Sequence, residues 1–264
     1  MKKLLCVFLA VLMLMSFTAC GEETKTDKGT SNTSSTGTSD IHTTVTIYIP
    51  DTITIYQSDT LYATVTYVFE EGWQNKDAFT VTMGGDTDKL GGSGTIVYSD
   101  KKLTQEVSNG ATMETYYNDQ GQQIKMVNLY TSGGHREVTY TYDSMGRLVS
   151  EEVKMYDTAD SEAVTTTTDY TYIDTADGYT TTQEVNGHTM VSAYNKDGFQ
   201  ISQVTYRNGE EMSRTEVSYD EAGNMVSNVT YYNGQKQMEM KYTWKTVEVS
   251  SEVAARLPQF RKGN

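Results

Sequence analysis

The chain has 264 residues, with 35 acidic and 21 basic side chains and a formal net charge of −14 at neutral pH. This charge argues against nucleic-acid binding, because a phosphate backbone attracts a cationic surface. It also disfavours adsorption to anionic lipid, so membrane attachment would need another source. Both cysteines, Cys6 and Cys20, lie in the first twenty residues. The rest of the chain can therefore hold neither a disulfide nor a thiolate metal site.

The first nineteen residues have the parts of a secretory signal. Lys2 and Lys3 give a basic start, residues 4–15 are all apolar, and small side chains precede Cys20. The apolar run is shorter than the about 20 residues that a spanning helix needs. Residues 16–21, SFTACG, resemble the lipobox of bacterial lipoproteins. An ordinary signal with an incidental cysteine is the alternative.

The lipobox resemblance implies cleavage before Cys20 and a diacylglycerol on its thiol. The mature protein would then be anchored on the extracytoplasmic face of a cell membrane. Loss of two lysines with the signal would leave 19 basic and 35 acidic residues, a net charge of about −16. Residues 21–40 contain no Ile, Leu, Val or aromatic side chain. Such a segment cannot offset the entropy of ordering, so we expect a flexible spacer of about 25 Å.

The sequence after residue 41 predicts β-structure. Thr alternates with apolar residues over residues 44–49, 52–56 and 63–68, and period two is typical of strands. All 20 tyrosines and both tryptophans lie in this part, which predicts a thin, tyrosine-rich core. The predicted organisation is a signal (1–19), an anchor and spacer (20–40), an N-terminal β region (41–110), a repeat β region (111–249) and a C-terminal tail (250–264).

A five-residue motif recurs in the second half of the chain. It consists of Tyr, then Asp or Asn, two variable residues and Gly, and we expect each copy to form a turn between two strands. A degenerate copy begins at Tyr172, we expect the last copy to end near Tyr242, and the mean period is about 25 residues. The four clear copies contain the predicted structural residues Tyr117, Gly121, Tyr142, Asp143, Gly146, Tyr194, Gly198, Tyr219, Asp220 and Gly223.

Two further features accompany each copy. A second turn signal lies about halfway along the unit, as in Asn208-Gly209 and Asn233-Gly234, which predicts a hairpin. The third residue after each motif glycine is β-branched, as Ile124 and Ile201 illustrate. Valines three positions further along would point to the opposite face of a regular strand. Either a bulge therefore lies between the two positions, or both faces of the sheet are covered.

The repeat resembles the YD repeat of RHS-type proteins. Residues 142–148, YDSMGRL, match the full Tyr-Asp-x-x-Gly-Arg-Leu core. The resemblance implies antiparallel strands in a spiral sheet and a role in cell-surface contact or carbohydrate binding. Long arrays of that family enclose a toxin, but five or six units are too few to close a shell. The predicted fold is an all-β antiparallel meander of stacked hairpins in an extended, curved or spiral sheet, with a short helix possible after Ser251 and ended by Pro258.

No residue pattern predicts catalysis. His42, His135 and His188 lie far apart, and nucleophile-elbow, zinc-protease and phosphate-loop motifs are missing. Asp86 with Asp88 and Asp157 with Asp160 could offer oxygen ligands to Ca²⁺ but lack an EF-hand spacing. Adjacent acids such as Glu151-Glu152 and Glu210-Glu211 point to opposite faces of a strand. No catalytic residue, metal or cofactor is predicted.

The favoured function is non-catalytic. The predicted partners are the membrane, through the lipid on Cys20, and an unidentified envelope or extracellular ligand, either protein or glycan; nucleic acid is not a predicted partner. One alternative is a carbohydrate-binding component that uses exposed tyrosines. Another is a hydrolase with an unrecognised acidic site, which would need a cleft with two carboxyl groups about 5–10 Å apart.

Overall fold

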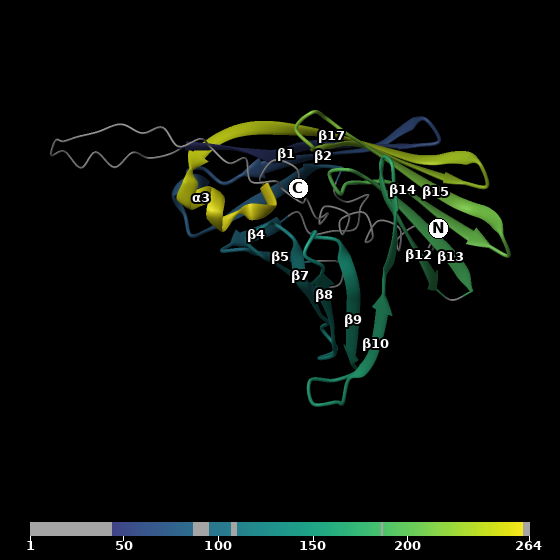
Figure 1. The fold of residues 1–264 in the computed structure, drawn as a ribbon. Coiled ribbons are helices and arrows are strands. Elements are labelled where there is room, and N and C mark those ends of the chain that lie inside the picture. The colour runs from purple at the N-terminus through teal and green to yellow at the C-terminus, as the bar shows by residue number, and fades with distance from the viewer. Residues whose placement is uncertain (1–43, 87–94, 107–109, 186, 261–264) are drawn as a thin grey trace, which may run out of the picture.

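The described residues form one antiparallel sheet of 17 strands with a short helix near the C-terminus (Figure 1). The computed structural model describes residues 44–86, 95–106, 110–185 and 187–260, so Cys20, His42, Asp88 and the spacer lie outside the described residues. The all-β prediction is confirmed. The elements are β1 (Thr44–Gln57), β2 (Thr60–Phe69), η1 (Trp73–Asn75), β3 (Ala78–Gly85), β4 (Thr95–Ser99), β5 (Lys102–Glu106), β6 (Thr112–Tyr117), β7 (Gln123–Leu129), β8 (His135–Tyr142), β9 (Leu148–Tyr156), β10 (Val164–Asp169), β11 (Thr171–Thr175), β12 (Gly178–Val185), β13 (His188–Asn195), β14 (Gln200–Arg207), β15 (Glu210–Tyr219), β16 (Met225–Tyr232), β17 (Gln235–Ser250), α3 (Ser251–Arg256) and η3 (Pro258–Phe260).

The sheet curves into a nearly closed barrel. Consecutive strands pair as a meander, and β17 returns to pair with β1 from Thr44–Ser250 to Gln57–Met238. One interruption remains: β10 pairs with β9, whereas β11, its continuation, pairs with β12. The curved sheet expected from the sequence therefore closes through its first and last strands, which removes most exposed edges.

Strand β1 is longer than the sequence indicates. The two alternating runs on either side of Pro50 belong to one strand, and the register shifts between Pro50 and Thr52 where β1 faces β17. Proline cannot donate to a strand ladder, and a bulge is a position where this loss is tolerated. Ile47, Ile49, Ile53 and Ile55 share one parity along β1, and all four are buried.

The main hydrophobic core fills one side of the barrel interior. Cross-strand neighbours Ile55 and Met240 are 3% and 1% exposed, and both belong to a single cluster. Strands β1–β4 and β15–β17, with η1, α3 and η3, supply this cluster. We call this part the apolar half. Its buried members from the sheet are Ile47, Ile49, Ile53, Ile55, Ala63, Val65, Tyr67, Phe79, Val81, Ile96, Tyr98, Val217, Met225, Met240, Tyr242 and Val249.

The C-terminal segment packs into this core. The Ser250 hydroxyl accepts a hydrogen bond from the Val253 amide, which caps α3. Phe260 of η3 lies 5.0 Å from the ring of Tyr98 and 6.1 Å from that of Phe69. Residues 250–260, expected as a tail, therefore cover part of one end of the barrel (Figure 1).

The opposite side has a much smaller apolar cluster. Met113, Met126 and Val138 form it, with Tyr140 and Val153 packed alongside. The inward face of β12–β14 instead presents polar residues such as Thr181 and Ser192, which are 3% and 6% exposed. We call β8–β14 the tyrosine half. Its inward-facing tyrosines are Tyr140, Tyr142, Tyr172, Tyr179 and Tyr194, with Tyr170 between β10 and β11.

Candidate binding site

The four clear repeat motifs fold into the same turn. Asp143 shows the pattern: its Oδ1 accepts hydrogen bonds from the amides of Met145 and Arg147, both at 2.9 Å, and its carbonyl accepts one from Gly146 at 3.0 Å. A carboxylate or an amide oxygen can serve as this acceptor, which explains the Asp or Asn at the second position. The equivalent acceptors elsewhere are Asn118, Asn195 and Asp220, and the motif glycines Gly121, Gly146, Gly198 and Gly223 all have φ between 80° and 84°.

A bulge follows each of these turns. Tyr117 pairs with Gln123 while Tyr116 pairs with Lys125, so Ile124 is the extra residue in β7. The other three motifs repeat this shift, and the extra residues are Val149, Ile201 and Val226. The β-branched third position is thus the bulge, which resolves the conflict of parity seen in the sequence.

An aromatic side chain of one unit satisfies the backbone of the unit before it. The Tyr142 hydroxyl donates to the Gln123 carbonyl at 2.6 Å, and the Tyr219 hydroxyl donates to the Gln200 carbonyl at 2.9 Å. Tyr172 bonds the Leu148 carbonyl in the same way. In the last copy Trp244, not Tyr242, fills this role, because its indole nitrogen lies 2.7 Å from the Met225 carbonyl.

Three turns that lie at the same end of the barrel border a cleft of about 310 Å³. They are the β8–β9, β11–β12 and β13–β14 turns, brought together because strands of a meander return to the same end. The lining includes the side chains of Met145, Arg147, Asp174, Tyr179 and Lys196. Its volume lies at the lower end of the range typical for small-molecule sites.

Arg147 is the most constrained polar residue of the cleft. Its Nε donates to Asp143 Oδ2 at 2.7 Å and its Nη1 lies 3.1 Å from Asp174 Oδ1. The guanidinium also sits 5.0 Å and 5.6 Å from the ring centres of Tyr172 and Tyr179. The hydrogen bond to Asp143 raises the pKa of Arg147. Burial would raise the pKa of Asp143, but the bonds from Arg147 and Met145 outweigh it and lower that pKa.

Aromatic packing fixes the floor beneath Arg147. The rings of Tyr179 and Tyr194 stack with centres 4.8 Å apart, and Tyr172 meets Tyr179 edge-on at 5.2 Å. Burial, followed by the nearby hydroxyl of Tyr194, raises the pKa of Tyr172. Since Tyr194 and Arg147 lie against the ring of Tyr179, that ring positions the guanidinium and has little face left for stacking a ligand.

The cleft can recognise charged and hydroxylated groups. Arg147 and Lys196 provide cations, and Asp174, whose side chain is 79% exposed, provides an acceptor. The Asp174 side chain is largely solvated, so a ligand anion could take its place beside Arg147 with little loss. Within the described ranges, no group of three or more His, Cys, Asp or Glu side chains could hold a metal ion.

Of the residues predicted from the sequence, the cleft gathers Gly146 and Gly198, with Asp143 holding Arg147 from behind. Gly121 and Gly223 form equivalent turns but do not line it. Sequence reasoning missed Arg147, Asp174, Tyr179 and Lys196 as a group. Arg147 was visible as the arginine of the complete YD match; the others come from turns that only the closed sheet brings near.

The other predicted sites are separate. Tyr170 lies 3.5 Å from the carboxylate of Glu151, whereas the neighbouring Glu152 pairs with Lys154, so these two acids point to opposite faces as expected. His135 stacks on Tyr156 with ring centres 4.0 Å apart. Most tyrosines are inward-facing; the exposed ones include Tyr130 and Tyr232, 42% and 48% exposed, on different hairpins. The described strands therefore do not present a row of exposed rings on which a sugar could stack.

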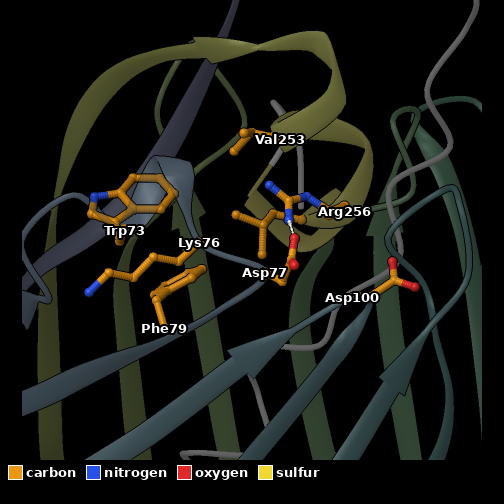
Figure 2. Close-up of a pocket in the computed structure, with 8 residues that line it drawn as sticks. Trp73, Lys76, Asp77, Phe79, Asp100, Val253 and Arg256 are labelled. Atoms are coloured by element: carbon orange, nitrogen blue, oxygen red, sulfur yellow. Dashed lines mark hydrogen bonds and ion pairs between the residues drawn. The ribbon is translucent and has the colours of Figure 1, made fainter.

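A second cavity lies beside α3 (Figure 2). Trp73, Phe79, Val253 and Arg256 contribute to its lining, and Arg256 reaches Asp77 at 2.6 Å. Its volume is about 10 Å³, which is room for about one water molecule. We assign it to the packing of the C-terminal segment.

No family model matches the sequence, and no curated protein matches it either. Among solved structures, the chain is similar to a porin-like protein from Bacteroides uniformis, at 14% identity and a TM-score of 0.42, covering 76% of this chain and 96% of that one. It is also similar to a β-barrel-like protein with a domain of unknown function from Brucella abortus, at 11% identity and a TM-score of 0.23, covering 76% and 98%. Identities this low carry no information on what the chain binds. No helix among the described residues is long and apolar enough to cross a membrane.

Proposed function

We propose that the protein is a lipoprotein anchored through Cys20 on the extracytoplasmic face of a membrane, and that its barrel is a non-catalytic binding domain. The lipobox-like segment and the spacer support the anchor. The convex face supports an aqueous location for the barrel, because ion pairs cross neighbouring strands there. Examples are Lys102–Glu114 at 2.6 Å and Lys125–Glu137 at 3.2 Å. A charged side chain facing lipid costs about 2–4 kcal/mol near the bilayer midplane.

The anchor is tested by Cys20→Ala. Without a thiol to lipidate, the mature protein should leave the membrane fraction and appear in the soluble fraction. Cys6→Ala, which lies inside the predicted signal, serves as the matched control and should stay membrane-bound. Membrane retention of the Cys20→Ala protein after signal cleavage would contradict the anchor.

The Arg147 cleft carries the binding proposal. Two cations and an exposed carboxylate surround about 310 Å³ of space, in a chain whose overall charge is strongly negative. A carboxylate-bearing carbohydrate fits this combination, since its acid group would bind Arg147 and its hydroxyls would bond Asp174 and the turn backbone. Because the ring faces beneath are occupied, recognition would rest on hydrogen bonds and charge.

The test compares uronic-acid oligosaccharides with neutral ones of the same length, titrated into the purified mature protein. We expect binding of the acidic series only, and at least a tenfold loss in Arg147→Gln. Gln is chosen because Gln122 holds the equivalent position after Gly121, so the turn accepts it. Arg207→Gln, on an exposed strand end, is the matched control. Equal binding by wild type and Arg147→Gln would remove the cleft as the site.

A further inference from the structure

The one interruption of the barrel exposes a strand edge. Residues Val164–Thr175 run as one extended segment in which Tyr170 marks a change of partner. Before Tyr170 the segment pairs with β9, from Val164–Met155 to Asp169–Ser150, and after it the segment pairs with β12. Among the described residues, β10 pairs with no strand other than β9. Figure 1 shows the β9–β10 hairpin diverging from β12 and β13, so the barrel is split along β10.

The backbone of β10 offers hydrogen-bonding groups to this split. The Tyr170 amide donates to the Val149 carbonyl at 3.0 Å, which fixes Tyr170 as a residue whose amide faces β9. Because residues alternate in an antiparallel ladder, Thr166 and Thr168 also face β9. The N–H and C=O groups of Thr165, Thr167 and Asp169 then point into the split. Across it, the pairing of β12 with β11 ends at Thr182.

This edge lacks the features by which proteins usually block strand addition. Its sequence, VTTTTD, has no lysine, no proline and no bulge. Five of its six residues are exposed, and Thr168 is half-buried. β-branched residues favour extended backbone, so the strand is already in the conformation that a partner strand would need. An open edge of this kind binds extended peptides through main-chain hydrogen bonds.

The charges around the split select the partner. The loop that joins β9 to β10 contains Asp157, Asp160 and Glu162, and the two strand edges add Asp169 and Glu184. Lys154 of β9 is already paired with Glu152 at 2.7 Å. Side chains of an added strand would therefore meet carboxylates on both sides of the split. A second copy of this acidic chain would be repelled, whereas a cationic strand would be attracted.

We infer that the β10 edge is a docking site for an extended cationic peptide segment, which adds to the sheet as an extra strand beside Val164–Asp169. This site is separate from the Arg147 cleft and does not rest on the acidic-carbohydrate proposal. Backbone bonds to Thr165, Thr167 and Asp169 would set the register. Lysine or arginine side chains on the added strand would contact the surrounding carboxylates.

The test uses an eight-residue synthetic peptide in which lysine alternates with threonine and valine, titrated into the mature protein by fluorescence anisotropy. Two control peptides carry either N-methyl groups on alternate backbone amides or glutamate in place of lysine. We expect both controls to bind at least tenfold more weakly. Binding that survives N-methylation would reduce the contact to non-specific charge attraction, and equal binding of the acidic peptide would exclude charge selection. Either result overturns the inference, and both are obtained with the wild-type protein.

Protein variants then locate the site. Thr167→Pro removes an N–H that faces the split and should weaken peptide binding at least tenfold, while Thr167→Ala keeps that N–H and should bind as wild type. Arg147→Gln should also bind the peptide normally, which separates this site from the cleft. Unchanged binding by Thr167→Pro would place the peptide elsewhere. A wild-type dimer in sedimentation that Thr167→Pro abolishes would identify a second copy as the occupant and contradict the cationic partner.

Discussion

The two halves of the barrel share one backbone pattern and differ in what they enclose. In the apolar half, buried isoleucines and valines form a continuous cluster that includes residues of α3 and η3. In the tyrosine half, rings, hydroxyls and amides face inward. Three buried residues of β6, β7 and β8, at the border of this half, form a separate small cluster: Met113, Met126 and Val138. Strand pairing therefore closes a sheet without requiring a uniform core. Both the cleft and the split lie on the side where the apolar core is thin.

The repeat turns add polar contacts to both halves of the barrel. Each bulge takes one residue out of the ladder, and an aromatic side chain from the next unit bonds the backbone there. Tyrosine is suited to this role because its ring fills space and its hydroxyl donates a hydrogen bond. In the tyrosine half these contacts supplement a thin apolar core, whereas the apolar half has a large buried apolar area as well.

Alkaline pH should destabilise both halves strongly. Burial raises the pKa of Tyr67, Tyr98 and Tyr242 in the apolar half as well as those of tyrosines in the tyrosine half. Burial raises the pKa of Tyr170 to about 12 and also raises those of Tyr140, Tyr142 and Tyr172. The unfolded value is about 10, so stability is unaffected below pH 10 and is lost as pH rises toward the folded values. Each such tyrosine can remove up to about 1.4 kcal/mol per pH unit. Urea unfolding at pH 8, 10 and 11 should show a steep decline.

Hydrogen exchange at pH 10.5 locates that loss. Amides of β9–β14 should lose protection before those of β1–β4 and β17, because the continuous apolar core holds the latter strands. Tyrosinate absorbance provides the second readout, and we expect most tyrosines to ionise only as the barrel unfolds. A single titration near pH 10 with the fold intact would contradict the buried tyrosine face.

Matched methionines test the two cores. Met240 in the apolar half and Met126 in the smaller cluster are 1% and 2% exposed. Truncation of a buried methionine costs about 2–5 kcal/mol, depending on how far the surroundings collapse. We expect Met240→Ala to cost about 4 kcal/mol and Met126→Ala about 2 kcal/mol, measured by chemical denaturation. Equal losses would mean that the thin core is packed as well as the thick one.

Sequence reasoning reached the features that are local. Alternation predicted the strands, Asn208-Gly209 and Asn233-Gly234 both have positive φ between adjacent strands, and Ser250 and Pro258 bound the short helix. The β-branched residues after each glycine left two interpretations open, a bulge or a sheet covered on both faces, and the strand pairing shows the bulge. Closure through β1 and β17 and the split at Tyr170 are pairings between distant segments, which propensity does not encode. The cleft could not be predicted for the same reason, because Arg147 and Lys196 line one space only when the sheet is curved.

The motif glycines should matter in both halves. Gly223 precedes β16 in the apolar half and Gly146 borders the cleft, and both have positive φ, at 84° and 80°. A β-branched side chain at such a position is strained by about 1–2 kcal/mol. Gly223→Val and Gly146→Val should each lose about that much stability in denaturation experiments, while Ser144→Ala in the same type of turn should lose little. Equal midpoints for all three variants would show that the turns tolerate a side chain.

The smallest effect concerns the acid that holds Arg147. Asn118 and Asn195 form the same turn with an amide, so Asp143→Asn should keep the backbone bonds and lose only the ion pair. We expect a cost of about 0.5–1 kcal/mol at pH 7. The pKa of Asp143 is lowered in the folded state, so its contribution is present above the unfolded value of about 3.9 and is lost as pH falls through the folded value. Denaturation at pH 7, 5 and 3 should therefore show wild type and Asp143→Asn converging under acid. A constant difference at all three would assign the effect to the turn and leave Arg147 held by its tyrosines alone.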